Sequence, residues 1–499
     1  MGRSSQKMPD FDPPDENGLF LASRNGLRTY ADLDRYKEFF LQLLIDHEVD
    51  LSRPIGFLSN SRDEQVMAIA SCWLLGLRFV CFNPKATRDE LARQLDGFTP
   101  AVIFTDEDHR SAIPEELCIE IDLLEPDQAL EMNLTLGTKA QKFTPVVTPE
   151  KVFGYFFTSG TTGDPKIVPL KRRQMELAAE ASANNFRPLT NHFWLLCLPL
   201  NHIGGVAVIL RSLLYGSGIY RMSSFDEEMI TTFLSENPLV QVASLVPTML
   251  KKLMEQKAFT VHKNLLALLL GGGPVSSVLI QEAISRGIPV VSSYGMTETC
   301  AQIAANPLLK PSGTYAPRNS VGEIFSPNEI QIRDENGTPL GPNNSGTIWL
   351  KGPQVFDGYL DSEMTRQAFD EDGWFNTGDY GHMNAHDQLF IESRRSDMIV
   401  TGGVNVSPFE VESELEKIEP VSEAAVFGIP DEEWGQKVVA VVAVKAEQSI
   451  EAEELQLKLK ERLSAYKVPK QILQADSLPK TQTGKLNREE LLKMFLKRS

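Results

Sequence analysis

Short apolar segments alternate with helical segments over much of this chain, and this rhythm restricts the fold more than any other feature. Residues 54–60, 78–84 and 101–106 have the length and apolar content of buried strands. The segments 29–44 and 64–77 have the pattern of helices. Parallel strands need a crossover connection, usually a helix, so the rhythm predicts a parallel sheet covered by helices on both faces.

The alternation resumes and then changes character twice. We expect further buried strands at 152–157, 192–200, 240–247 and 265–273, and helices at 227–237 and 277–287. From about residue 321, short strands separated by Gly, Asn and Asp turns predict a small antiparallel barrel or sandwich. The sequence therefore predicts an α/β fold. A large N-terminal domain (residues 1–395) of parallel α/β sheets plus a small β-barrel precedes a small mobile α+β C-terminal domain (residues 396–499).

Charge and cysteine usage limit the partners. The 499 residues include 67 Asp and Glu against 49 Lys and Arg, a net charge of −18, which disfavours binding to nucleic acid or to anionic membranes. Five scattered cysteines without CxxC spacing indicate free thiols in a reducing compartment. The polar N-terminus has no apolar signal region, and no stretch reads as a transmembrane span. We expect a cytoplasmic protein without stable membrane insertion. The sequence is compatible with either a monomer or a homo-oligomer.

A Ser/Thr/Gly-rich loop follows the strand at 152–157 and has the composition of a phosphate-binding loop. A polyphosphate is bound by hydroxyls, by successive backbone N–H groups and by a lysine. The glycines allow the backbone to fold around the anion. The GxxxxGK[ST] spacing of a Walker A loop is absent, and a plain surface turn is the alternative. The candidate residues are Thr158, Ser159, Gly160, Thr161, Thr162, Gly163 and Lys166.

Together with other motifs, this loop resembles the signature of the adenylate-forming superfamily, which includes acyl-CoA synthetases, adenylation domains and beetle luciferases. The resemblance covers the chain from about residue 20 to its C-terminus, with the motifs in the family's order. Besides the loop, it rests on 293–298 (SYGMTE), 374–379 (WFNTGD), 394–397 (RRSD), 402–412 (GGVNVSPFEVE) and 479–485 (PKTQTGK).

Within the superfamily, three longer segments are most similar to the o-succinylbenzoate–CoA ligases of menaquinone (vitamin K2) biosynthesis. They are 194–216, 269–303 and 394–413. The resemblance implies an ATP-dependent acid–thiol ligase that forms an acyl-AMP, releases pyrophosphate and transfers the acyl group to coenzyme A. Another aryl- or fatty-acyl-CoA ligase is the alternative, and a non-catalytic nucleotide-binding protein of the same fold is a remote one. Ile167, Asn201 and Ser407 depart from the usual pattern, and Asn201 leaves the fine shape of the pocket in doubt.

The resemblance also implies roles for single residues. Glu298 would bind Mg²⁺ beside the ATP phosphates, Thr297 would contact the α-phosphate, and Lys485 would bridge the attacking carboxylate and that phosphate. ATP, Mg²⁺ and coenzyme A are thus the implied cofactors and cosubstrate, and a small carboxylic acid is the substrate. The remaining implied residues are Gly271, Gly272, Gly273, Pro274, Ser293, Tyr294 and Gly295 for adenine, Asp379 and Arg394 for ribose, His202 and Ser292 for the acid, Gly402 and Gly403 for coenzyme A, and Ser396 and Asp397 as the hinge.

Arg211 stands out from its own surroundings. The segment 206–215 (VAVILRSLLY) is apolar on nearly every face, so the pattern places a guanidinium on a buried helix. A buried guanidinium needs an anionic partner. The second carboxylate of a dianionic substrate would supply one, and an internal Asp or Glu, or extension of the side chain to the surface, is the alternative.

Overall fold

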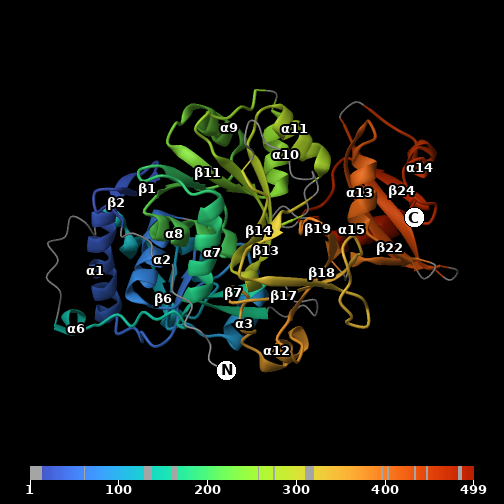
Figure 1. Ribbon diagram of the computed structural model, residues 1–499. Coiled ribbons are helices and arrows are strands. Elements are labelled where there is room, and N and C mark those ends of the chain that lie inside the picture. Colours follow the sequence, from blue (N-terminus) through green and yellow to red (C-terminus); the bar gives the residue numbers. More distant parts are fainter. Residues whose placement is uncertain are drawn as a thin grey trace.

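The computed structural model describes residues 14–60, 62–127, 138–158, 166–256, 258–273, 276–308, 320–394, 397–401, 404–431, 434–445, 448–480 and 486–498. Figure 1 shows a large N-terminal body, which contains three of the four sheets, and a smaller C-terminal body beside it. Both the α/β class and the division into a large N-terminal and a small C-terminal part agree with the sequence prediction. Among the helices of the described ranges, none has the length and apolar character needed to span a bilayer.

The first sheet has six strands in the order β6-β5-β3-β4-β7-β8 and is parallel except for the β7–β8 pair. The predicted strands at 54–60, 78–84, 101–106 and 152–157 all lie in it. Acidic residues open helix α2, and Gly76 closes it in the left-handed region (φ 63°). The elements are β3 (Ile55–Leu58), α2 (Asp63–Leu75), β4 (Phe79–Cys81), α3 (Arg88–Gly97), β5 (Val102–Thr105), α4 (Glu107–Arg110), β6 (Cys118–Glu120), α6 (Thr138–Gln141), β7 (Val152–Thr158) and β8 (Lys166–Lys171).

The second sheet has nine strands in the order β15-β14-β13-β12-β11-β9-β10-β1-β2, with a parallel centre and antiparallel edges. Its parallel strands end at one edge, where the loops that carry function gather. The strands are β1 (Leu19–Ser23), β2 (Gly26–Thr29), β9 (Phe193–Leu196), β10 (Gly218–Arg221), β11 (Val240–Leu245), β12 (Ala267–Leu270), β13 (Val290–Met296), β14 (Ala301–Ala305) and β15 (Glu323–Ile324). The helices nearby in the chain are α1 (Tyr30–Asp46), α7 (Arg172–Asn185), α8 (Ile203–Tyr215), α9 (Glu227–Glu236), α10 (Pro247–Glu255) and α11 (Ser277–Ser285).

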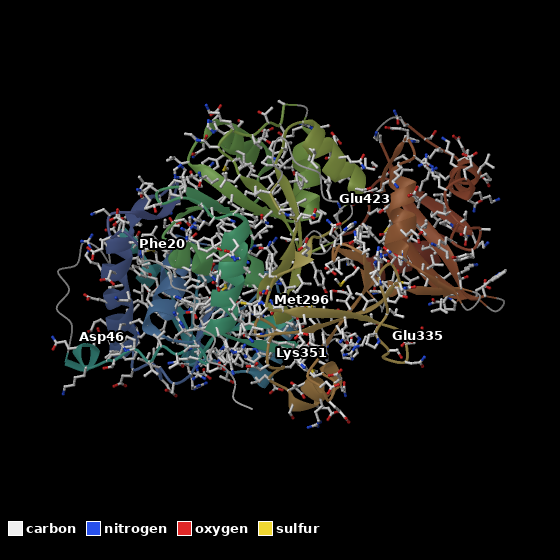
Figure 2. The ribbon with its side chains drawn as sticks, in the orientation of Figure 1. Phe20, Asp46, Met296, Glu335, Lys351 and Glu423 are labelled. Atoms are coloured by element: carbon white, nitrogen blue, oxygen red, sulfur yellow. The ribbon has the colours of Figure 1, made fainter. Side chains whose placement is uncertain are left out.

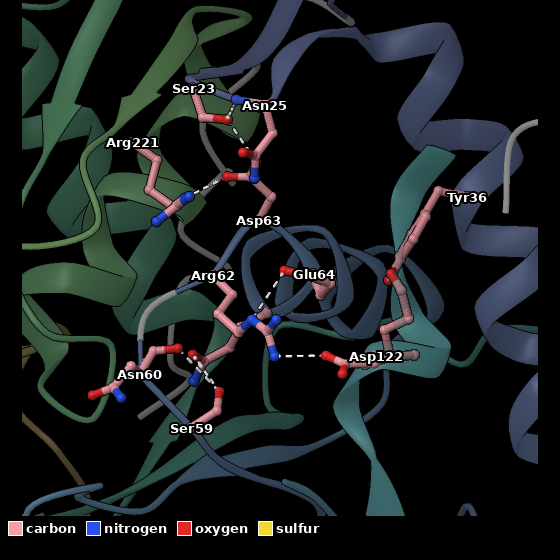
Figure 3. Close-up of polar contacts among 12 residues, drawn as sticks. Ser23, Asn25, Tyr36, Ser59, Asn60, Arg62, Asp63, Glu64, Asp122 and Arg221 are labelled. Atoms are coloured by element: carbon pink, nitrogen blue, oxygen red, sulfur yellow. Dashed lines mark hydrogen bonds and ion pairs between the residues drawn. The ribbon is translucent and has the colours of Figure 1, made fainter. Parts of the chain in front are cut away.

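A buried ion pair joins the two sheets. Arg221, at the end of β10 in the second sheet, pairs with Asp63, the first residue of α2 (Figure 3). Asp63 also accepts hydrogen bonds from the hydroxyl of Ser23 (2.5 Å) and the amide of Asn25 (3.0 Å). The carboxylate is therefore satisfied where it is buried, as a charge between two packed layers must be.

The last N-terminal strands form an antiparallel sheet in the order β16-β17-β18-β19, where the sequence predicted a small antiparallel barrel. The C-terminal body has a second antiparallel sheet, β21-β20-β23-β22, to which β24 adds in parallel, and two hydrophobic clusters of its own. The elements are β16 (Glu329–Arg333), β17 (Gly346–Lys351), α12 (Ser362–Ala368), β18 (Phe375–Met383), β19 (Leu389–Arg394), β20 (Ile399–Thr401), β21 (Val404–Val406), α13 (Pro408–Glu416), β22 (Val421–Asp431), β23 (Gly435–Val444), α14 (Ala452–Lys460), β24 (Gln471–Ala475) and α15 (Arg488–Arg498).

Candidate active site

Two motifs that are distant in sequence meet through one hydrogen bond. The phenol of Tyr294, on β13, donates to Oδ2 of Asp379, on β18, at 2.7 Å. Both side chains are buried, with 8% and 6% of their surface exposed. Arg394, on β19, is the register partner of Asp379 on the neighbouring strand, so the chain also brings this predicted ribose residue to the same place.

A tight turn after β13 presents the predicted metal ligand. Met296 ends β13 near the middle of the molecule, where the sheets converge (Figure 2). Its N–H donates to the hydroxyl of Thr299 (2.9 Å), which closes the short helix that carries Thr297 and Glu298. A Cβ on Gly295 would lie 1.7 Å from the carbonyl oxygen of Ala301, so the turn requires glycine here.

Tyr359 connects the phosphate loop to this turn. Its phenol donates to Oε1 of Glu298 at 2.9 Å, and the ammonium of Lys166 lies 5.0 Å from the centre of its ring. One aromatic side chain thus positions both the predicted Mg²⁺ ligand and the predicted phosphate lysine. Tyr359 was not among the predicted site residues, because nothing in the sequence alone distinguishes it from the other tyrosines.

The start of the phosphate loop has an unsatisfied group. Thr158 ends β7, and its hydroxyl is buried with no hydrogen-bond partner among the described residues. Such an atom needs an explanation, and a phosphate oxygen would be a suitable partner. The other predicted loop residues, Ser159, Gly160, Thr161, Thr162 and Gly163, lie outside the described residues.

The predicted adenine segment lies at the end of β12. Gly271 approaches β13 closely, because a Cβ there would lie 3.3 Å from the hydroxyl of Ser293, which itself donates to the carbonyl of Leu270 (2.7 Å). Gly272 has a φ of +79°, which favours glycine. Gly273 follows, beside Pro247 of α10. Pro274 lies outside the described residues.

Two of the predicted acid-binding residues lie on different elements, His202 at the start of α8 and Ser292 on β13. His202 stands just before the first turn of α8, and the amide of Asn201 lies 3.3 Å from the His202 ring nitrogen Nε2. The unusual Asn201 therefore contacts the histidine that it precedes. Ser292 is a buried residue of β13, opposite Leu270 of β12 in register.

Arg211 lies on the buried part of α8 without a carboxylate partner. It is 2% exposed, and in the part of the chain that the structure describes its Nε and Nη2 atoms have no hydrogen-bond partner. Burial lowers the pKa of Arg211, and the ionisable groups that act on it, Tyr215 and Cys300, have pKa values raised by burial to about 12. Both are therefore neutral near pH 7. The guanidinium lies 5.6 Å from the centre of the Trp194 ring. Within the described ranges, no Asp or Glu forms an ion pair with Arg211, so the alternative of an internal carboxylate loses its support.

The remaining predicted residues belong to the C-terminal body or its junction. Asp397 lies next to Arg488, whose Nε atom is 3.4 Å from its carboxylate. The predicted hinge residue Ser396, the predicted coenzyme A residues Gly402 and Gly403, and the predicted catalytic Lys485 lie outside the described residues.

The site suits a metal that is held mainly by its substrate. In the ranges that the structure describes, no group of three or more His, Cys, Asp or Glu side chains could hold a metal ion. Mg²⁺ typically binds one or two carboxylates and completes its shell with phosphate oxygens and water. A single carboxylate at Glu298, linked through Tyr359 to the predicted phosphate lysine Lys166, fits that pattern.

The fold and these motifs define an adenylate-forming enzyme. The family described as AMP-binding enzyme matches residues 16–360, and its C-terminal domain matches residues 410–485. The chain belongs to this family. It is 36% identical over 482 residues to the 2-succinylbenzoate–CoA ligase of Listeria monocytogenes, covering 96% of both chains.

Two solved structures of the o-succinylbenzoate CoA synthetase of Bacillus subtilis are also similar. The complex with the acyl-adenylate intermediate OSB-AMP is 30% identical, covers 95% of both chains and has a TM-score of 0.84. The complex with ATP and a magnesium ion is 30% identical, covers 95% of this chain and 97% of the other, and has a TM-score of 0.83.

Proposed function

We propose that this chain is an ATP-dependent 2-succinylbenzoate–CoA ligase of menaquinone biosynthesis. Membership of the AMP-binding family supports the reaction class, and similarity over almost the whole chain to ligases of this name supports the particular acid. The structural observation that carries the choice of acid is Arg211, a buried guanidinium without a carboxylate partner among the described residues. A substrate with a second carboxylate would supply that partner as a bidentate pair.

In the first half-reaction, a carboxylate oxygen of the acid bonds to the α-phosphorus of ATP, and the α–β phosphoanhydride bond breaks to release pyrophosphate. The carboxylate is its own nucleophile, so the residues have to neutralise charge and align two anions. Lys166 and Thr158 would hold phosphate oxygens, Thr297 the α-phosphate, and Asp379 the ribose hydroxyls. Mg²⁺, held by Glu298, would supply neutralisation of the phosphate charge.

In the second half-reaction, the thiol sulfur of coenzyme A bonds to the acyl carbon, AMP leaves and the thiol proton is released. We place the boundary between the two domains at 395/396 and the hinge at Ser396 and Asp397. A rotation about this hinge would exchange Lys485, which serves adenylation, for Gly402 and Gly403 beside the thiol. Glycines there would leave room for the narrow pantetheine arm.

The proposed partners are the small acid, ATP and coenzyme A, with no nucleic acid, and a homo-oligomer remains open. The net charge of −18 supports the exclusion of nucleic acid. We place the reaction in the cytoplasm, because all five cysteines are free thiols.

A panel of acids tests the proposal. The purified protein is given ATP, Mg²⁺ and coenzyme A with 2-succinylbenzoate, benzoate, cinnamate or decanoate, and the thioester is detected by mass. We expect 2-succinylbenzoate to give the highest kcat/KM. Preference for a monocarboxylic acid would refute the assignment and favour another aryl- or fatty-acyl-CoA ligase.

Two further analogues test the role of Arg211. 4-Oxo-4-phenylbutyrate lacks the ring carboxylate, and 2-butyrylbenzoate lacks the succinyl carboxylate. We expect Arg211 to bind the carboxylate that does not react. Arg211→Met should then lower kcat/KM strongly for 2-succinylbenzoate. It should have little effect on kcat/KM for the analogue that retains only the reactive carboxylate. Equal losses with both acids would show that Arg211 does not recognise the second carboxylate.

A further inference from the structure

Helix α10 of the N-terminal body makes a charged contact with strand β22 of the C-terminal body. The ammonium of Lys251 donates to the carbonyl oxygen of Ser422 at 2.7 Å and lies 3.9 Å from Oε2 of Glu423. The side chains of Lys251 and Glu423 are 27% and 16% exposed, so water screens this contact only in part. Figure 2 shows Glu423 on the side of the C-terminal body that faces α10 and α11.

Glu423 has a second cationic partner in its own body. Its Oε1 atom lies 2.9 Å from the ammonium of Lys480. Lys480 forms an antiparallel bridge with Leu486, the residue that follows Lys485 in the sequence. Glu423 therefore contacts both Lys251 of α10 and Lys480. The bridge between Lys480 and Leu486 flanks Lys485 in the sequence on both sides.

The charge of Lys251 also acts on a second acidic side chain of the C-terminal body. Burial raises the pKa of Glu416, at the end of α13, to about 7, while Lys251 and the hydroxyl of Ser276 lower it. Ser276 precedes α11 of the N-terminal body. Lys251 therefore pairs with Glu423 and acts electrostatically on Glu416 as well.

The two bodies also contact each other near their junction, through different residues. Near the junction, the hydroxyl of Ser407 donates to the carbonyl of Glu392 at 2.7 Å. A contact beside a hinge leaves the rotation angle largely free, whereas a second contact away from the hinge fixes it. The group formed by Lys251, Ser422, Glu423 and Lys480, here called the α10 latch, supplies that second contact.

The α10 latch also lies beside the nucleotide segment. A Cβ on Gly273 would lie 3.9 Å from Pro247, the first residue of α10, and Lys251 follows about one helical turn later. The whole chain also superposes on the acyl-adenylate complex of the Bacillus subtilis synthetase with a TM-score of 0.84 over 95% of its length. The α10 latch therefore connects α10, beside the predicted nucleotide segment, with the strand bridge that flanks the Lys485 segment.

We propose that Lys251 is a positioning residue that holds the C-terminal body in the orientation used for acyl-adenylate formation, and that the α10 latch opens before thioester formation. The proposal rests on the proposed function, because it assigns the latch to one half-reaction of that ligase. Lys251 acts through the orientation of the C-terminal body and contacts neither the substrate nor the reacting atoms.

Lys251→Met tests the proposal against a matched control. Methionine keeps the length and apolar stem of lysine but removes its charge. The adjacent Lys252 is 53% exposed and pairs with Glu227 inside the N-terminal body, so Lys252→Met removes an equal charge without touching β22. Each half-reaction is measured separately: pyrophosphate release without coenzyme A, and thioester formation from preformed adenylate.

We expect Lys251→Met to slow adenylate formation by about five- to tenfold, the effect of losing one charge-assisted contact, and to leave thioester formation unchanged or faster. Lys252→Met should change neither rate. Equal losses in both half-reactions of Lys251→Met, or no loss in adenylation, would overturn the proposal.

A distance measurement does not depend on the substrate. Spin labels at Glu236→Cys on α9 and Leu457→Cys on α14, both exposed positions, report the separation of the two bodies. Lys251→Met should broaden the distance distribution of the unliganded protein, and Lys252→Met should keep it as in the parent. An unchanged distribution in Lys251→Met refutes the latch, whereas failure of the parent protein to activate any acid refutes the proposed function alone.

Discussion

Replacing Arg211 with methionine should stabilise the unliganded protein. The Nε and Nη2 atoms of Arg211 are buried and have no hydrogen-bond partner within the described ranges, and each unsatisfied buried group costs about 1–3 kcal/mol, more when charged. Methionine removes both groups and fills a similar volume. It also removes the contact with the ring of Trp194, which contributes about 0.5–2 kcal/mol. The first effect is larger, so we expect a net gain of about 1 kcal/mol and a rise in Tm of about 2 °C.

The same change should abolish stabilisation by the acid. A ligand at 100 times its Kd stabilises a folded protein by about 2.7 kcal/mol. Loss of one partner of a buried charge pair costs about 2–5 kcal/mol of binding, a drop in affinity of about 30-fold or more. Scanning fluorimetry with and without 2-succinylbenzoate measures both effects. The parent protein should gain in Tm when the acid is added, and Arg211→Met should gain little.

Arg172→Met is the matched control. Arg172 is also buried, but it donates to the carbonyl of Trp73 (2.8 Å), stacks on that ring at 3.6 Å and lies 3.6 Å from Glu176. Its loss should destabilise the protein and leave the acid-induced shift intact. If Arg211→Met destabilised the protein as Arg172→Met does, or kept the full shift with the acid, the reasoning on Arg211 would be refuted.

Three further changes test other parts of the site. Tyr359→Phe removes the hydrogen bond to Glu298, and a hydrogen bond to a charged acceptor is worth about 1.5–3 kcal/mol. The variant should release pyrophosphate at least tenfold more slowly. Its melting temperature, measured by circular dichroism, should stay close to that of the parent protein. Tyr294→Phe removes the donor to Asp379 and should raise KM for ATP more than it lowers kcat in steady-state assays; a change in kcat alone would contradict this role. Burial raises the pKa of Glu416 to about 7 from 4.5, so protonation of this residue contributes stability that is fully present below pH 4.5 and is lost as the pH rises through 7. Glu416→Gln should therefore make the decline of Tm between pH 4.5 and pH 7 shallower. An unchanged decline would show that another group causes it.

Local patterns predicted most of the fold because they report local physics. The apolar runs at 54–60 and 240–247 became β3 and β11, since each has the length and burial of a strand inside a covered sheet. The order of strands was not predictable in the same way. β1 pairs with β10, almost two hundred residues later in the chain, and only the packed structure reveals that pairing.

The candidate site divides in the same manner. Tyr294 and Asp379 belong to recognisable motifs, and the structure joins them by a hydrogen bond. Tyr359 and Lys251 belong to no motif, because their roles come from what surrounds them after folding. Arg211 lies between these two cases. Its apolar sequence context predicted burial, but only the folded structure shows that it has no carboxylate partner among the described residues.

The most direct test of the central claim is detection of the intermediate. The protein is mixed with ATP, Mg²⁺ and 2-succinylbenzoate without coenzyme A, quenched, and analysed by mass spectrometry; coenzyme A is then added to a second sample. We predict that 2-succinylbenzoyl-AMP and pyrophosphate appear first, and that coenzyme A converts the adenylate into the thioester and AMP. Release of ADP and phosphate, or a thioester formed without any adenylate, would contradict the account.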